Sequence, residues 1–133
     1  MKHLIDFLTK HPIGFLASID NGKPRVRPFG FQFFENGNFF FITSNQKAIY
    51  HQLVKTPYAE FSSISDDWTI ARVKGQVGFS DNLQKKERAL GNSPMAKKIY
   101  KTPDNPQLEL IYIHSGEAIL FSLTGNKSEE FRF

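Results

Sequence analysis

The sequence predicts a mainly β protein, an antiparallel barrel of six to seven strands with short flanking helices. Apolar runs of strand length recur along the chain, tight-turn sequences join several of them, and a few segments change to helical spacing. The chain has 133 residues, of which 40% are hydrophobic and 23% charged. This size and composition predict a single domain over residues 1–133.

The first half of the chain predicts a helix followed by a three-stranded meander. Apolar residues recur at helical spacing over residues 2–10, and Pro12 ends that helix. Asn-Gly sequences at 21–22 and 36–37 are tight-turn signals between extended runs. The strands expected around these turns cover residues 13–19, 25–34 and 39–43.

The second half alternates helices and strands. Helical spacing returns at residues 46–54, and Thr56-Pro57 ends this helix. Further helices are expected at 82–89 and 93–101, and strands at 58–64, 69–79, 108–113 and 118–123. We expect His114-Ser115-Gly116 to turn a closing hairpin, and residues 126–133 to be a tail or an edge strand.

The composition excludes several kinds of site and predicts a compartment. The chain has no cysteine, which excludes disulfides and thiolate metal sites and fits a reducing compartment. The four histidines show no metal-ligand spacing. Neither a signal peptide nor an apolar run of membrane length is present, so we expect a cytoplasmic protein with no membrane partner. The formal net charge of +4 predicts an anionic partner, with a solvated basic surface as the alternative.

The first candidate binding segment lies in the strand after the first turn. Alternate strand side chains share a face, and one face would carry Lys23, Arg25, Arg27, Phe29, Phe31 and Phe33. That face changes from cationic to aromatic, which suits a ligand with a phosphate at one end and a flat ring at the other. The alternatives are solvated arginines above a phenylalanine core, or a bulge at Pro28 or Gly30 that breaks the alternation.

The second candidate segment, residues 43–47, lies where a strand ends and a helix begins. Ser44 or Asn45 is expected to cap the helix, leaving backbone N–H groups free for an anion. Lys47 would then lie in the first helical turn, where the helix dipole opposes a cation unless an anion is bound. An incidental surface lysine is the alternative. Neighbouring strands would bring Arg25, Arg27, Thr43, Ser44 and Lys47 to one phosphate.

The order of these motifs resembles the pyridoxamine 5'-phosphate oxidase-like, FMN-binding split-barrel family. The likeness covers residues 2–123: helix, hairpin with R-x-R-P-F, strand ending in T-S-x-x-K, helix, Thr-Pro and strand. It implies a split barrel and a homodimer that holds each FMN between its subunits. The implied phosphate ligands are Arg25, Arg27, Thr43, Ser44 and Lys47, with Asn45 beside them. Backbone at Val26, Pro28 and Phe29 would lie along the flavin ring.

One further contact is implied by the dimer. Trp68 would cover the flavin of the partner subunit, and a buried core tryptophan is the alternative. The phenylalanine-rich stretch 29–41 is expected to supply the apolar dimer face.

The resemblance predicts an FMN-dependent oxidoreductase of unknown substrate, with a small-molecule substrate or reductant at the open flavin face. The genuine pyridoxamine phosphate oxidases carry a C-terminal tryptophan and arginine signature, whereas this chain has no tryptophan there. The closer likeness is therefore to the short branch of the family. A non-catalytic flavin-binding or stress protein is one alternative, and a deazaflavin or another phosphorylated ring would meet the same site.

A third function class is a nucleic-acid-binding barrel, which would use a basic run as its contact surface. The simpler interpretation of that run is a solvated helical face. Its members are Lys85, Lys86, Arg88, Lys97, Lys98 and Lys101.

Overall fold

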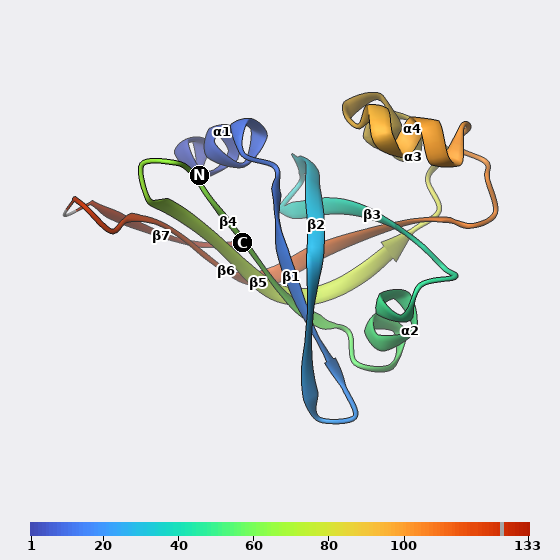
Figure 1. The fold of residues 1–133 in the computed structure, drawn as a ribbon, viewed down its shortest axis with the longest axis horizontal. Coiled ribbons are helices and arrows are strands. Elements are labelled where there is room, and N and C mark those ends of the chain that lie inside the picture. The colour runs from blue at the N-terminus through green and yellow to red at the C-terminus, as the bar shows by residue number, and fades with distance from the viewer. Residues whose placement is uncertain (126) are drawn as a thin grey trace.

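A computed structural model describes residues 1–125 and 127–133 (Figure 1). In this part of the chain four helices and seven strands follow one another. The helices are α1 (Lys2–Lys10), α2 (Ala48–Lys55), α3 (Leu83–Asn92) and α4 (Pro94–Tyr100). The strands are β1 (Ile13–Asp20), β2 (Lys23–Glu35), β3 (Asn38–Ser44), β4 (Tyr58–Ile64), β5 (Thr69–Ser80), β6 (Leu108–Ser122) and β7 (Ser128–Arg132). No helix in these ranges is long and apolar enough to cross a membrane.

The strands form one antiparallel sheet in the order β3-β2-β1-β4-β5-β6-β7, and β3 also pairs with β6. That second pairing closes β1 to β6 into a barrel and leaves β7 on its edge. The predicted fold class, an antiparallel split barrel of six to seven strands with short helices, is confirmed. Both predicted Asn-Gly turns are present, and all four of their residues have positive φ, as a type I′ hairpin turn requires.

The barrel is split because β2 and β3 share only a short ladder. β2 pairs with β1 from Lys23 to Gly30, but its register with β3 covers only Phe31 to Glu35. β3 continues along β6 as far as Ser44. In Figure 1, β2 and β3 diverge from their common end, and α2 lies on the side toward which β3 runs. The space between the β1-paired half of β2 and the end of β3 is called the split below.

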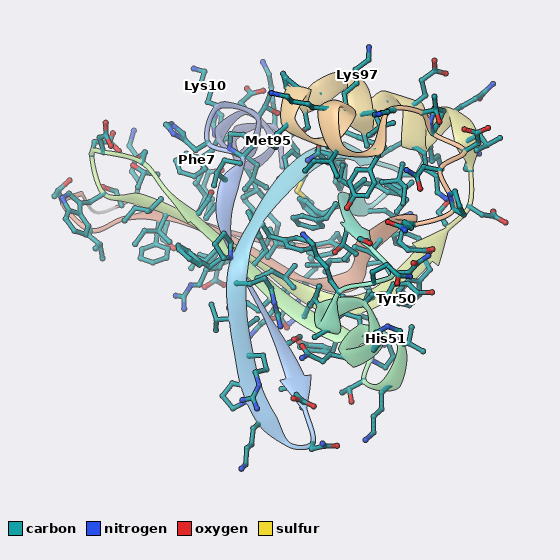
Figure 2. The ribbon with its side chains drawn as sticks, turned by 45° about the vertical axis from the view of Figure 1, so that its right-hand side comes forward. Phe7, Lys10, Tyr50, His51, Met95 and Lys97 are labelled. Atoms are coloured by element: carbon teal, nitrogen blue, oxygen red, sulfur yellow. The ribbon has the colours of Figure 1, made fainter. Side chains whose placement is uncertain are left out.

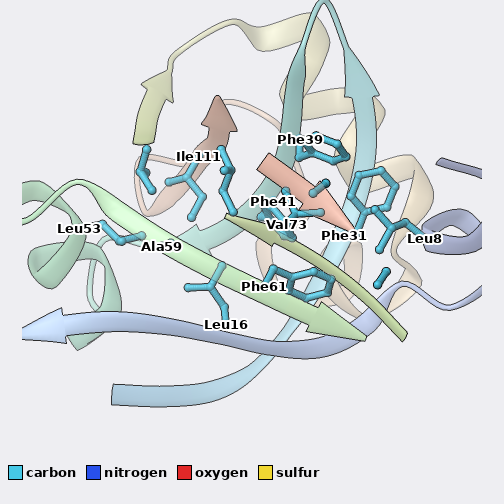
Figure 3. Close-up of a cluster of buried hydrophobic side chains, with 14 of the residues drawn as sticks. Leu8, Leu16, Phe31, Phe39, Phe41, Leu53, Ala59, Phe61, Val73 and Ile111 are labelled. Carbon is cyan, nitrogen blue, oxygen red and sulfur yellow. The ribbon is translucent and has the colours of Figure 1, made fainter. Parts of the chain in front are cut away.

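The core fills the barrel and is closed at its two ends by helices. Figure 3 shows it extending from Leu53 of α2 and Leu16 of β1, past Phe41 and Phe61, to Leu8 of α1. All five side chains are fully buried. Burying one such side chain stabilises the fold by about 1.5–3 kcal/mol, so α1 and α2 are held as parts of the core.

The phenylalanine-rich stretch lies in this core, so its predicted role as the dimer face is wrong. Phe31, Phe33, Phe39, Phe40 and Phe41 are all at most 4% exposed. The barrel interior and the layer under α3 together cover the aromatic surface that the sequence alone left without a partner.

A bulge in β2 divides these phenylalanines between two faces. Phe31 pairs with Phe41, but Phe33 pairs with Phe40, so one extra residue of β2 lies between them. Phe33 therefore turns outward and stacks on Phe40 at 4.6 Å between ring centroids. The predicted face shared by Arg25, Arg27, Phe29 and Phe31 is consistent with the pairing, but the placement of Phe33 on it is wrong.

The predicted closing hairpin at residues 114–116 is also wrong, because β6 is one strand of 15 residues. Its register with β5 shifts at Gly75, which faces both Ser115 and Gly116. Ser115 has a φ of 50°, so the extra residue is absorbed in a bulge and the chain does not reverse. β5 supplies ladder partners on both sides of the bulge, which keeps β6 extended. Of the two expectations for residues 126–133, the edge strand is confirmed as β7 over Ser128–Arg132, and Asn126 lies outside the described residues.

Candidate functional site

Arg27 lies on the inner side of β2, held by oxygen atoms of β1 and α2. Its Nη1 donates to Ser18 Oγ at 2.8 Å and to the Leu16 carbonyl at 3.1 Å. Its Nη2 donates to Gln52 Oε1 of α2 at 2.7 Å, and Ser18 Oγ donates to the same Gln52 oxygen at 2.6 Å. The sequence analysis did not identify Ser18 or Gln52, since a single serine in a strand and a glutamine in a helix carry no motif.

The charge around Arg27 is not neutralised by these contacts. All its described hydrogen bonds go to uncharged oxygens, whereas Arg25 is paired with Asp20 at 3.4 Å. Burial, and in second place the charge of Arg25, lower the pKa of Arg27. Arg27 stays a cation, and a bound anion would offset the cost of holding this charge partly buried among uncharged oxygens.

The free edge of β2 presents backbone groups to the split. Two-residue hairpin turns make the flanking residues a hydrogen-bonded pair, and bonded pairs then alternate along the ladder. Arg25, Arg27 and Phe29 thus bond to β1, while the polar backbone groups of Val26 and Pro28 face away from it. The same alternation accounts for the Phe31 N–H, which donates toward the β1 side, to the Pro12 carbonyl at 2.8 Å.

The side chains on this edge differ in exposure. Val26 is 63% exposed on the outer face. Phe29 packs inward, with its ring centroid 5.8 Å from that of Phe41. The cationic-to-aromatic order predicted for this face therefore runs from Arg25 to Phe31, and no further.

On the other side of the split, the end of β3 carries a buried hydroxyl without a partner. Thr43 is 3% exposed, and its Oγ1 has no hydrogen-bond partner among the described residues. Ser44 Oγ accepts from the Gln46 N–H at 3.1 Å. Burial raises the pKa of Tyr100, and the Ser44 hydroxyl acts in the opposite direction.

The predicted capping of α2 is wrong. The helix starts at Ala48, and its N-cap is Lys47, which makes no side-chain capping bond. Residues 44–47 form a turn instead, closed by a hydrogen bond from the Lys47 N–H to the Ser44 carbonyl at 3.1 Å. Asn45 Nδ2 donates to the Pro106 carbonyl at 2.7 Å and to Glu109 Oε2 at 2.9 Å, which ties this turn to β6 and prevents Asn45 from capping.

The Arg27–Gln52 hydrogen bond connects β2 to α2, the helix that follows the second predicted segment. Gln52 follows Ala48 by four residues, about 6 Å along the helix axis. The Arg27 guanidinium therefore lies close to the first turn of α2, which follows the exposed Lys47. Figure 2 shows α2, with Tyr50 and His51 labelled, beside the β1–β2 hairpin. The structure thus brings residues 25–29 and 43–47 to the two sides of one split.

Trp68 lies elsewhere, in the turn between β4 and β5. Its side chain is 56% exposed and its φ is 64°, so the alternative of a buried core residue is wrong. Hydrogen bonds with Ser65 and Thr69 hold the pKa of Asp67 below its usual value, which makes this carboxylate part of the turn. Figure 1 shows the turn beside α1, away from the tip of the β1–β2 hairpin. The turn that carries Trp68 therefore lies away from the split of its own chain.

Comparisons with known proteins agree with this architecture. The model of the pyridoxamine 5'-phosphate oxidase family matches residues 1–120. A NimC/NimA family protein from Clostridium acetobutylicum is 29% identical, with a TM-score of 0.88 over 100% of this chain and 92% of that one. A search of curated proteins finds no match.

Two more distant structures show the likeness of fold alone. General stress protein 26 from Bacillus anthracis is 18% identical, with a TM-score of 0.79 over 99% of this chain and 98% of that one. A pyridoxamine 5'-phosphate oxidase-related, FMN-binding protein from Nostoc punctiforme is 18% identical, with a TM-score of 0.65 over 96% of this chain and 84% of that one. Since the family model spans nearly the whole barrel, this chain belongs to the pyridoxamine 5'-phosphate oxidase family.

Proposed function

We propose that the protein binds FMN in the split and uses it as a flavin-dependent oxidoreductase of unknown substrate. The observation that carries the proposal is Arg27, a cation held by uncharged oxygens next to the start of α2. Family membership supports it, and so does the likeness to a solved structure described as FMN-binding. The absence of cysteine supports a cytoplasmic location.

The residues around the split fit a phosphate group. Arg25 and Arg27 supply guanidinium donors, and the first turn of α2 supplies backbone N–H groups that have no partner within the helix. Thr43 Oγ1 is a buried hydroxyl that a phosphate oxygen would satisfy. Lys47, immediately before the helix, adds a cation, and Ser44 and Asn45 hold the turn that places it.

The free edge of β2 suits the ring of the same ligand. The Val26 N–H and the carbonyl groups of Val26 and Pro28 face the split, where they would bond to the polar edge of a flavin. When bound, FMN supplies hydride or electron transfer. The chain binds the phosphate, orients the ring along β2 and limits access to its open face, where a small-molecule substrate or reductant would dock.

The first experiment is the absorption spectrum of the purified protein, followed by titration with FMN and riboflavin. We expect a visible flavin spectrum and tighter binding of FMN, because riboflavin lacks the phosphate. Anaerobic NADH or NADPH should then bleach the flavin. A colourless protein with no affinity for FMN would contradict the proposal and favour the nucleic-acid alternative.

A second candidate function is a non-catalytic flavin-binding or stress protein, which the likeness to general stress protein 26 favours. Both candidates predict a bound flavin, so the spectrum does not separate them. Flavin that binds but is not reduced by any small reductant tested would favour this second function.

We also propose a homodimer with each flavin between the subunits. In this proposal residues 25–29 and 43–47 flank the flavin in the split, and a second chain would cover its open side. The outer face of β1 and β2 carries exposed apolar side chains, among them Ile13 at 72%, Phe15 at 58% and Val26 at 63%. These lie beside the free edge of β2, so one partner surface would bury them and enclose the ring.

Replacing Phe15 by lysine should weaken the dimer at least about a hundredfold, because a two-fold interface would bury the new charge twice. Sedimentation at micromolar concentration measures the change. Leu83→Lys is the matched control, since Leu83 is 53% exposed at the start of α3 and is not one of the side chains of the proposed face. A wild-type protein that is monomeric with flavin bound would overturn the dimer proposal.

Trp68→Ala should change the fluorescence and the reduction rate of bound flavin while lowering the free energy of unfolding by only about 1 kcal/mol or less. The small stability effect follows from the 56% exposure of Trp68. Leu123→Ala is the control, because Leu123 is 59% exposed and its N–H donates to the Trp68 carbonyl. Unaltered flavin fluorescence in Trp68→Ala would remove Trp68 from the proposed site.

A further inference from the structure

We infer that Ser18 and Gln52 are positioning residues that fix the Arg27 guanidinium with its Nε side open to an anion. The inference rests on the proposed function, because it details how the phosphate end of that site is built. Neither residue need touch the ligand, since both would act through Arg27.

The three side chains form a closed hydrogen-bonded set. Arg27 Nη1 reaches Ser18 Oγ at 2.8 Å, Arg27 Nη2 reaches Gln52 Oε1 at 2.7 Å, and Ser18 Oγ donates to Gln52 Oε1 at 2.6 Å. Two adjacent oxygens therefore hold the two terminal nitrogens of the guanidinium. Because the oxygens are also bonded to each other, the guanidinium has little freedom to rotate away from them.

The remaining donors of Arg27 form a second fork. A guanidinium has five N–H groups, and Nε–H lies parallel to one N–H of Nη2. The described hydrogen bonds of Arg27 involve only Nη1 and Nη2, and none uses Nε. The Nε–Nη2 side thus keeps the geometry that binds two oxygens of a phosphate.

The chemistry of the holding pair suits this role. A carboxylate at position 52 would neutralise Arg27 and compete with an incoming phosphate. The amide oxygen of Gln52 accepts the same hydrogen bond without a charge. Ser18 is 2% exposed, so water does not compete for the hydrogen bonds that its hydroxyl makes with Arg27 and Gln52. Gln52 also ties the guanidinium to α2, whose first turn would share the anion.

The test compares Ser18→Ala, Gln52→Met and Gln52→Glu with the wild type by fluorescence titration of FMN and of riboflavin. Ser18→Ala and Gln52→Met should each weaken FMN binding about tenfold, the effect of losing one hydrogen bond to a charged group, and leave riboflavin unchanged. Gln52→Glu should weaken FMN binding further. Ser63→Ala is the matched control, because Ser63 is equally buried at 2% but its Oγ has no partner among the described residues.

Equal losses for FMN and riboflavin, or no loss for FMN, would overturn the positioning role, since a merely structural effect does not select for the phosphate. The thermal shift produced by inorganic phosphate separates this inference from the proposed function. The wild type could bind FMN no more tightly than riboflavin and yet show a thermal shift with phosphate that disappears in Ser18→Ala. The flavin proposal would then be wrong, and the positioning of Arg27 for an anion would be supported. If the wild type prefers FMN and the variants do too, only the positioning role fails.

Discussion

Arg27→Met is expected to weaken FMN binding at least about a hundredfold, the largest effect of any substitution at the proposed site. A charge-assisted hydrogen bond to an anion contributes roughly 1.5–3 kcal/mol, and the Nε–Nη2 fork would make two of them. Equilibrium titration of FMN measures the loss. Arg27→Lys should recover only part of it, because a lysine keeps the charge and loses the fork.

Lys98→Met is the matched control for the charge. Lys98 is exposed on α4, has no described ion pair and is not among the proposed phosphate ligands. The variant removes one positive charge and should leave FMN affinity unchanged. If Arg27→Met and Lys98→Met weakened FMN binding equally, the net charge and not a specific site would explain the affinity. If the wild type bound FMN and riboflavin equally well, the proposed phosphate site would be contradicted.

Gly116→Ala is expected to lower the free energy of unfolding by about 3 kcal/mol, the upper part of the range for overpacking. A Cβ at Gly116 would stand 1.9 Å from the Lys74 carbonyl oxygen and 2.7 Å from Gly75 Cα. Both obstacles are backbone atoms of β5, so relief requires the β5–β6 ladder itself to move. Denaturant unfolding followed by circular dichroism measures the change.

Gly91→Ala should instead raise the free energy of unfolding. Gly91 lies inside α3, where an added Cβ meets nothing within 4 Å, and alanine favours helix over glycine by about 1 kcal/mol. A similar loss of stability in both variants would contradict this explanation. The contact between Gly116 and the β5 backbone would then not be the cause of the destabilisation by Gly116→Ala.

The barrel could be predicted from the sequence because the local turn and helix-end signals favour the same strands and helices that the packing of the core stabilises. Several strand and helix boundaries lie where local residues predict them. They are the two Asn-Gly turns, the end of α1 before Pro12 and the end of α2 at Thr56-Pro57. The R-x-R-P-F and T-S-x-x-K segments lie on β2 and at the end of β3, and their role as a phosphate site stays a prediction. The contacts that hold Arg27 could not be predicted, because Ser18 and Gln52 approach it only in three dimensions.

The errors share one physical cause. Alternation predicts a strand face only while the register is constant, and bulges in β2 and β6 each add one residue to it. Phe33 was therefore assigned to the wrong face, and Ser115-Gly116 was interpreted as a chain reversal. At the start of α2, Asn45 has a long-range partner in Glu109, which outweighs its local tendency to cap a helix.

Pro24 and Pro28 limit the pairing of a further strand at the free edge of β2. Pro24 and Pro28 occupy the pairs of the β1 ladder that exchange no hydrogen bonds, so neither removes a bond from the hairpin. On the open side they remove the N–H donors that an incoming strand would need. Between them only Val26 keeps a donor facing that way. The edge is therefore a poor template for a further strand, while a ligand that needs only a few backbone contacts could still bond to it.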